Sequence, residues 1–103
     1  MTEVIIPFKE QFRDAMLSGT KTATSRTKRY GWPNDTFEAF GQTFVITDVY
    51  RLPVFRVAHY LHKEEGFENK GDFWQTLREI LPRLSEGAKV YVHRFKIKGE
   101  ETE

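Results

Sequence analysis

Leu17-Ser18-Gly19-Thr20-Lys21-Thr22-Ala23-Thr24-Ser25-Arg26 is the stretch that decides the fold of this chain. It follows a predicted helix in which Phe8, Phe12 and Met16 recur every four residues and form one apolar stripe. Pro7 suits the first turn of that helix, and Gly19 suits its C-terminal end. The quoted stretch is therefore expected to leave a helix and enter a polar segment.

The rest of the chain divides by its apolar periodicity into strands and two further helices. Residues 20–35 show no period and contain Gly31 and Pro33, so we expect one long polar loop there. A second helix is predicted from Pro53 to near Gly66, and a third is capped by Asn69 and kinked or interrupted at Pro82. Strands are expected at 36–40, 43–50 and 90–97, with a short apolar strand at 4–6.

The order helix, loop, strand pair, two helices and strand defines an α+β fold class, because only one strand follows the helices. So few strands must curl to protect their edges, which favours a small, partly open barrel. A chain of 103 residues fits a single domain, spanning 1–103 with 1–6 and 98–103 as flanking termini and 100–103 as a frayed acidic tail.

Composition excludes several classes of protein. The chain has no cysteine, so neither disulfides nor thiolate metal sites can form. It begins without a signal-peptide pattern and has no apolar run near the ~20 residues of a membrane span, so we expect a cytoplasmic protein with no membrane contact. His59 and His62 lack a carboxylate partner at metal-site spacing, and phosphate-binding glycine loops are absent; we expect no metal and no cofactor.

Charge is distributed unevenly, although the net charge is only +1. Residues 15–34 and 87–99 each hold four Lys or Arg and no acid. Such segments would raise the affinity for a polyanion. The alternative is a solvated surface whose charge is offset by acids elsewhere.

Lys21 and Thr24 form a candidate reactive pair three residues apart. A threonine hydroxyl needs a base to become nucleophilic, and a lysine amine can be that base once burial or a nearby cation such as Arg26 lowers its pKa. Glu65 could then pass a proton to a leaving amine. The plainer interpretation is that Lys and Thr are ordinary polar loop residues and that a Glu before Gly is an ordinary helix end.

The stretch 17–26 resembles the signature of ASCH domains: a small residue and Gly, then Lys-Thr, then Thr-x-Arg. Gly31-Trp32-Pro33-Asn34-Asp35 resembles that family's Gly-Asp turn, with Asn34 where Gly is usual. Glu65-Gly66-Phe67 with the later Phe73-Trp74 resembles its middle segment, and 90–95 resembles its closing strand. The resemblance covers residues 8–97.

This resemblance implies a small PUA-like mixed β-barrel flanked by about three helices, and an association with RNA. Some small bacterial members of the family remove the acetyl group from N4-acetylcytidine. In those amidohydrolases the residues that match Lys21, Thr24 and Glu65 are catalytic, so the resemblance implies the same three roles here.

The loop after the signature holds candidate binding residues. Arg26, Lys28 and Arg29 suit phosphate or base contacts, and Tyr30 and Trp32 could stack on a base, although Trp32 could equally pack over the barrel. Three functions stay open: an amidohydrolase, a non-catalytic RNA-binding module, and a metal-independent ribonuclease using Lys21 and Arg26. The expected partner is RNA or a modified nucleoside bound by a monomer; whether the chain has a protein partner is not encoded in any pattern of the sequence.

Overall fold

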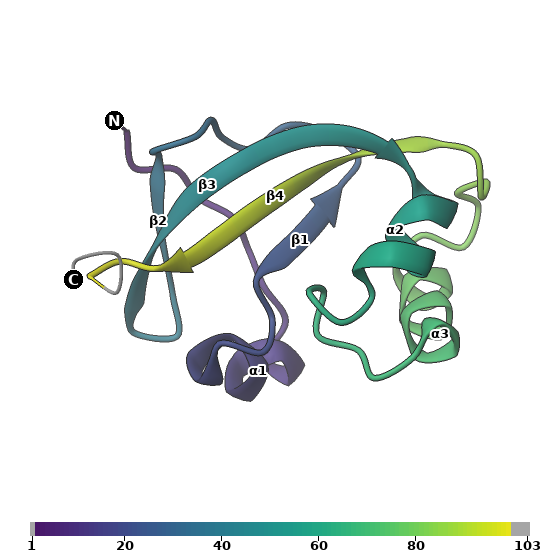
Figure 1. Ribbon diagram of the computed structural model, residues 1–103, viewed down its shortest axis with the longest axis horizontal. Coiled ribbons are helices and arrows are strands. Elements are labelled where there is room, and N and C mark those ends of the chain that lie inside the picture. Colours follow the sequence, from purple (N-terminus) through teal and green to yellow (C-terminus); the bar gives the residue numbers. More distant parts are fainter. Residues whose placement is uncertain (1, 100–103) are drawn as a thin grey trace.

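Two long antiparallel strands form the centre of the fold, which the computed structural model describes for residues 2–99 (Figure 1). They belong to a four-stranded sheet in the order β1-β4-β3-β2, with every neighbouring pair antiparallel. The strands are β1 (Ala23–Arg26), β2 (Thr36–Ala39), β3 (Gln42–Pro53) and β4 (Lys89–Ile97). The helices are the short 3-10 turn η1 (Glu10–Phe12), α1 (Arg13–Ser18), α2 (Val54–Leu61) and α3 (Lys70–Ile80).

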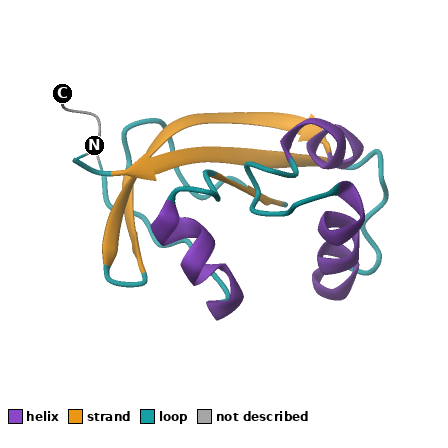
Figure 2. Ribbon diagram, turned by 60° about the horizontal axis from the view of Figure 1, so that its bottom comes forward, coloured by secondary structure: helices purple, strands orange, loops and turns teal. Residues whose placement is uncertain are grey.

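The sheet curls into a half-barrel, as the small number of strands predicted. The register between β3 and β4 shifts between Ile46 and Asp48, and such a bulge bends a strand and increases its twist. β2 and β3 are joined by a two-residue turn in which Phe40 and Gly41 both have positive φ (55° and 79°), the hairpin geometry that matches strand twist. α2 and α3 lie together at one end of the long strands, and α1 lies apart from them (Figure 2).

Two apolar clusters stabilise the two faces of this sheet. One joins α2 and α3 to the buried residues of β1 and β4, including Ala23, Val90 and Val92. The other joins the N-terminal segment and α1 to β2, β3 and β4, and holds a group of packed phenylalanine rings. The predicted stripe contributes to this second cluster through Phe8, Phe12 and the fully buried Met16.

The predicted second and third helices are confirmed. The apolar stripe of α2, formed by Val54, Val57, Ala58 and Leu61, is buried. The Asn69 side chain caps α3 by accepting a hydrogen bond from the Asp72 amide at 2.9 Å. Both helices are shorter than expected, since α2 ends at Leu61 and α3 ends before Pro82 instead of kinking there. Among residues 2–99, no helix combines the length and apolar character needed to cross a bilayer.

Three sequence predictions of secondary structure are wrong. Residues 23–26 form the edge strand β1 rather than part of a loop, because pairing with β4 and burial of Ala23 override a sequence with no strand period. Pro7 lies outside the helix, which begins with η1 at Glu10. Residues 4–6 form no strand. The N-terminal segment meets the sheet through a bridge from Glu3 to Thr36, a hydrogen bond from the Val4 amide to the Thr36 carbonyl, and the packing of the buried Ile6. The predicted frayed tail, 100–103, lies outside the described residues.

Candidate functional site

A cavity of about 420 Å³ lies beside the edge strand β1. The residues after β1, the N-terminal segment, the segment after α2, and α3 all contribute to its wall. The side chains that line it are mostly apolar, with a small polar group at the β1 side. The polar members are Lys21, Thr24, Ser25, Arg26, Thr27 and Glu65, and the aromatic members are Phe8, Phe12, Tyr30, Phe67 and Phe73.

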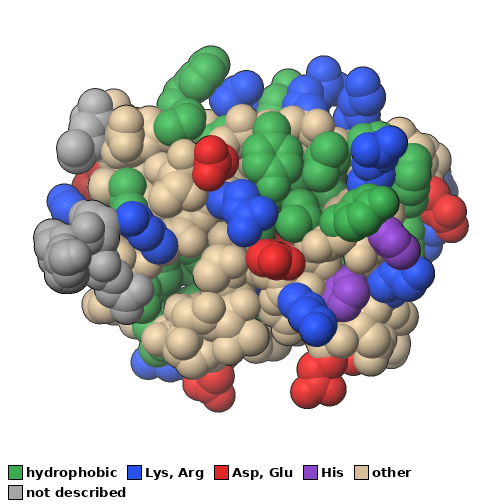
Figure 3. Space-filling model, in the orientation of Figure 1, with side chains coloured by type: hydrophobic (Ala, Val, Ile, Leu, Met, Phe, Trp, Pro, Cys, Tyr) green, Lys and Arg blue, Asp and Glu red, His purple; other side chains and the backbone are tan. Residues whose placement is uncertain are grey.

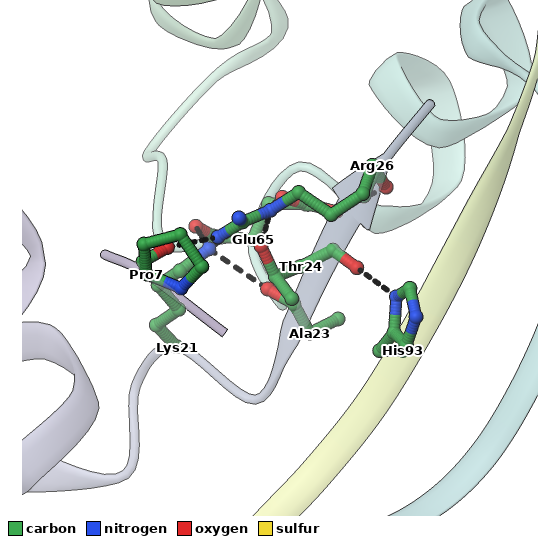
Figure 4. A network of polar contacts seen from close by, with 8 residues as sticks. Pro7, Lys21, Ala23, Thr24, Arg26, Glu65 and His93 are labelled. Atoms are coloured by element: carbon green, nitrogen blue, oxygen red, sulfur yellow. Dashed lines mark hydrogen bonds and ion pairs between the residues drawn. The ribbon is translucent and has the colours of Figure 1, made fainter. Parts of the chain in front are cut away.

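Lys21 is the most deeply buried cation described, with 3% of its surface exposed. Its Nζ donates to the carbonyl oxygens of Ala23 (2.8 Å) and Glu65 (2.7 Å), and it lies 3.5 Å from Glu65 Oε1 (Figure 4). Three acceptors fit the three hydrogens of an ammonium group. Burial lowers the pKa of Lys21, the Glu65 carboxylate opposes that effect, and the Arg26 guanidinium adds to it.

Glu65 is held next to Lys21 by the backbone around it. The Glu64 carbonyl accepts hydrogen bonds from the amides of Thr22 (2.7 Å) and Ala23 (2.9 Å), which fixes this segment against the start of β1. Gly66 has φ of +101°, and a Cβ there would lie 3.2 Å from the Lys21 Cβ. Glycine is therefore favoured at this position both by its backbone conformation and by the close approach of Lys21.

Thr24 and Arg26 lie on the same face of β1. Arg26 Nε donates to Thr24 Oγ1 at 3.1 Å, and Arg26 Nη2 donates to the Pro7 carbonyl at 2.8 Å. The guanidinium also packs over the rings of Phe8 (4.9 Å) and Tyr30 (5.6 Å). The Thr24 hydroxyl is thus polarised by a cation that the N-terminal segment holds in place.

His93 on β4 supports this part of β1 from within the fold. The Tyr30 amide donates to His93 Nε2 at 3.0 Å, so the ring proton is on Nδ1, which lies 3.4 Å from the Thr24 carbonyl. Burial lowers the pKa of His93, and the Thr24 carbonyl opposes that effect. A neutral His93 therefore links the positions of Thr24 and Tyr30.

The predicted site residues divide into two groups. Lys21, Thr24, Arg26, Glu65 and Tyr30 converge on the cavity, as expected for the first four. The side chains of Lys28, Arg29 and Trp32 do not line it.

Instead, Arg29 packs between the rings of Trp32 (4.0 Å) and Tyr91 (5.2 Å), while Lys28 packs on Tyr30. Trp32 is 62% exposed, so it is not a packed lid over the barrel. Figure 3 shows basic side chains gathered at the upper right of one face of the molecule.

Sequence reasoning missed Ser25 and the wall supplied by α3. Ser25 donates from Oγ to Glu65 Oε2 at 2.5 Å. The sequence predicted a loop at 23–26. A strand there would have placed the side chains of Thr24 and Ser25 on opposite faces and so indicated different contacts for the two residues. Thr76 and Leu77 line the cavity because α3 lies at that end of the sheet, a placement that no local pattern encodes.

Residues 2–99 contain no group of three His, Asp or Glu side chains that could hold a metal ion. His59 on α2 and His62 directly after it have separate partners. His62 Nδ1 lies 2.9 Å from the Ala58 carbonyl, and Lys70 Nζ lies 3.5 Å from His59 Nδ1.

No family model and no curated protein matches this chain in sequence. Solved structures with a similar fold do exist. An ASCH domain from Lactobacillus crispatus JV V101 superposes with a TM-score of 0.70 at 14% identity, covering 93% of this chain and 78% of that one. A point mutant of ZmASCH from Zymomonas mobilis superposes with a TM-score of 0.67 at 14% identity, covering 91% and 68%. Protein EF3133 from Enterococcus faecalis V583, of the family DUF984, gives 0.69 at 14% identity, covering 95% and 81%.

These similarities show the fold of the chain, an α+β half-barrel with a four-stranded antiparallel sheet. More specifically, the chain has the fold of ASCH domains, which confirms the fold expected from residues 17–26. At these identities the superpositions establish the fold only. Any activity has to be argued from the residues of the site.

Proposed function

We propose that the cavity binds a modified pyrimidine nucleoside, free or within RNA, and hydrolyses the acetyl amide of N4-acetylcytidine. The observation that carries this proposal is the buried Lys21–Glu65 pair, 3.5 Å apart, which lines the same cavity of about 420 Å³ as Thr24. Buried, charge-coupled groups in a pocket of this size are features of active sites. The resemblance of residues 17–26 and 65–67 to the acetylcytidine amidohydrolases supplies the substrate.

The roles are assigned to side chains that line this one cavity. Transfer of a proton from the Lys21 ammonium to Glu65 Oε1 would give a neutral amine and a neutral acid. The amine takes the Thr24 proton as Thr24 Oγ1 attacks the acetyl carbonyl, and Glu65 gives its proton to the leaving N4 of cytosine as the C–N bond breaks. These two transfers return Lys21 and Glu65 to their charged forms. Water then hydrolyses the acetyl-threonine ester, giving acetate and a proton and restoring the Thr24 hydroxyl.

Arg26 and Tyr30 would hold the substrate. The Arg26 guanidinium beside Thr24 Oγ1 is suited to stabilise the oxyanion that forms on the acetyl group. Tyr30 and the phenylalanine side chains of the wall give the cavity an aromatic lining suited to a pyrimidine base. These residues could also bind a modified base without chemistry.

Non-catalytic RNA binding is the second candidate function. The observation that favours it is the stack formed by the exposed Trp32 and the half-buried Arg29 and Tyr91. Its ring-to-cation distances are 4.0 and 5.2 Å, and none of the three residues lines the cavity. Such surfaces bind single strands through stacking and phosphate contacts. The ribonuclease alternative is less favoured, because the Lys21 charge is already paired with Glu65 and only Arg26 is left for a phosphorane.

The test is incubation of the purified protein with N4-acetylcytidine, followed by chromatography for cytidine and acetate. Equimolar release of both products supports the amidohydrolase. Saturable binding of N4-acetylcytidine without product supports the binding module instead. Cleavage of a plain RNA oligonucleotide in the presence of a chelator would support the ribonuclease.

A further inference from the structure

Ser25 and Thr24 are neighbours on the edge strand β1, and their side chains lie on opposite faces of the sheet. Thr24 is in register with His93, and Ser25 is in register with Val92, which belongs to the cluster beneath α2 and α3. Successive side chains of a strand point to opposite sides. Both nevertheless line the cavity, because β1 is an edge strand and the cavity extends around its edge.

The Glu65 carboxylate has one partner at each oxygen. Lys21 Nζ lies 3.5 Å from Oε1, and Ser25 Oγ donates to Oε2 at 2.5 Å. Glu65 lies in a turn between α2 and α3, where neither helix nor strand fixes its side chain. Its direction therefore depends on these two contacts, and only the Lys21 contact takes part in the proposed proton transfer.

We propose that Ser25 is a positioning residue for Glu65: by holding Oε2, it keeps Oε1 facing Lys21 and the leaving amine. This inference rests on the proposed amidohydrolase function and assigns to it a residue that the motif does not include. A carboxylate with a free Oε2 can rotate, and rotation breaks the line from Lys21 through Oε1 to the substrate nitrogen. Catalysis is sensitive to displacements of this size.

The proposal predicts that loss of the Ser25 hydroxyl affects the turnover of the substrate but not its binding. Substrate recognition is assigned to Arg26 and Tyr30, and neither side chain contacts Ser25 or Glu65 through a hydrogen bond among those described. Loss of the Ser25 hydroxyl should therefore reduce kcat and leave KM unchanged. A merely structural role would instead reduce the amount of folded protein and leave the kcat of the folded fraction intact.

The experiment compares three variants of the full chain with the wild type on N4-acetylcytidine. Ser25→Ala removes the hydroxyl, Ser25→Thr keeps it, and Ser85→Ala removes an exposed hydroxyl far along the chain as a matched control. We expect Ser25→Ala to lower kcat by roughly ten- to a hundredfold, part of the ~10²–10⁴ that acid–base catalysis supplies. KM should change less than about twofold, Ser25→Thr should keep most of the activity, and Ser85→Ala should match the wild type.

Two results would overturn the proposal while leaving the proposed function intact. One is wild-type kcat in Ser25→Ala. The other is equal impairment in Ser25→Ala and Ser25→Thr, which would mean that side-chain size rather than the hydroxyl matters. An inactive wild type, checked as folded by circular dichroism, would overturn the amidohydrolase itself and this inference with it.

Discussion

Lys21 Nζ lies 3.5 Å from Glu65 Oε1, although 44 positions of the chain separate the two residues. Both side chains are almost fully buried, so the fold bears the cost of removing two charges from water. The backbone provides for this contact through the Glu64 hydrogen bonds to β1 and the left-handed conformation of Gly66. This buried pair at the wall of a cavity is the arrangement that the proposed proton transfer requires.

Breaking the pair from one side should be costly. Lys21→Ala leaves the Glu65 carboxylate and two carbonyl groups without their donor, and we expect a loss of about 3–5 kcal/mol in the free energy of unfolding. The double variant Lys21→Met/Glu65→Gln should be less destabilised than Lys21→Ala, because no uncompensated charge is buried. Urea denaturation of the three proteins measures this. A loss below about 1 kcal/mol in Lys21→Ala would show that the pair is not buried as described.

Thr24→Ala should abolish turnover of N4-acetylcytidine and leave the protein folded. The substitution removes the hydroxyl that accepts from Arg26 Nε, while the small residue keeps the backbone pairing of β1 with β4. Hydrolysis measured by chromatography should fall by at least about a hundredfold, the scale expected when a nucleophile is lost. Residual activity within about tenfold of the wild type would exclude Thr24 as the nucleophile.

His93 should make the protein less stable in mild acid. Burial lowers its pKa in the folded state, so the unfolded chain binds the proton more readily. The stability linked to neutral His93 is complete above the unfolded value of about 6.5 and is lost as the pH falls below it.

Measurement of the unfolding free energy of the wild type and His93→Gln between pH 7.5 and 5 tests this. The wild type should lose up to about 1.4 kcal/mol per pH unit more than the variant below pH 6.5. His59 and His62 are present in both proteins and cancel in the comparison. Identical pH slopes would mean that His93 titrates normally.

The exposed basic loop should determine how RNA binding responds to salt. Lys28→Ala/Arg29→Ala removes two cations that lie outside the cavity, so binding of a single-stranded RNA should weaken and its salt slope should flatten by about 1.4 for two phosphate contacts at ~0.7 each. The control Lys63→Ala/Arg83→Ala removes two exposed cations elsewhere. Fluorescence anisotropy at several salt concentrations gives the slopes. Equal slopes in the two double variants would leave Lys28 and Arg29 as ordinary surface charges.

Local patterns predicted those parts of the fold that depend on local physics. The α2 stripe, the Asn69 cap and the left-handed Gly19 follow from neighbouring residues, and each is present. β1 escaped prediction because Ala23-Thr24-Ser25-Arg26 has no strand period and becomes a strand only when β4 pairs with it. Pairing over such a distance in sequence is a tertiary effect that overrides local preference.

Within the candidate site, too, some residues were predictable from local spacing, and others depend on tertiary contacts. The spacing of Lys21, Thr24 and Arg26, read with the resemblance, identified the side chains that converge with Glu65. It could not separate Tyr30 from Trp32, because the direction of each side chain depends on the Tyr30 amide bonding to His93 and on Arg29 packing over Trp32. Ser25 was missed because the sequence predicted a loop at 23–26, whereas the side chain reaches Glu65 from the edge strand β1.

The measurement that tests the central proposal most directly is the hydrolysis of N4-acetylcytidine by the wild type and by Glu65→Gln, with Ser85→Ala as the control. Glutamine keeps the shape of the side chain and an acceptor for Ser25, but it cannot carry a proton from Lys21 to the leaving amine. We predict equimolar cytidine and acetate from the wild type and the control, and at least about a hundredfold slower release by Glu65→Gln. No hydrolysis by the folded wild type, or equal rates in the wild type and Glu65→Gln, would contradict the account.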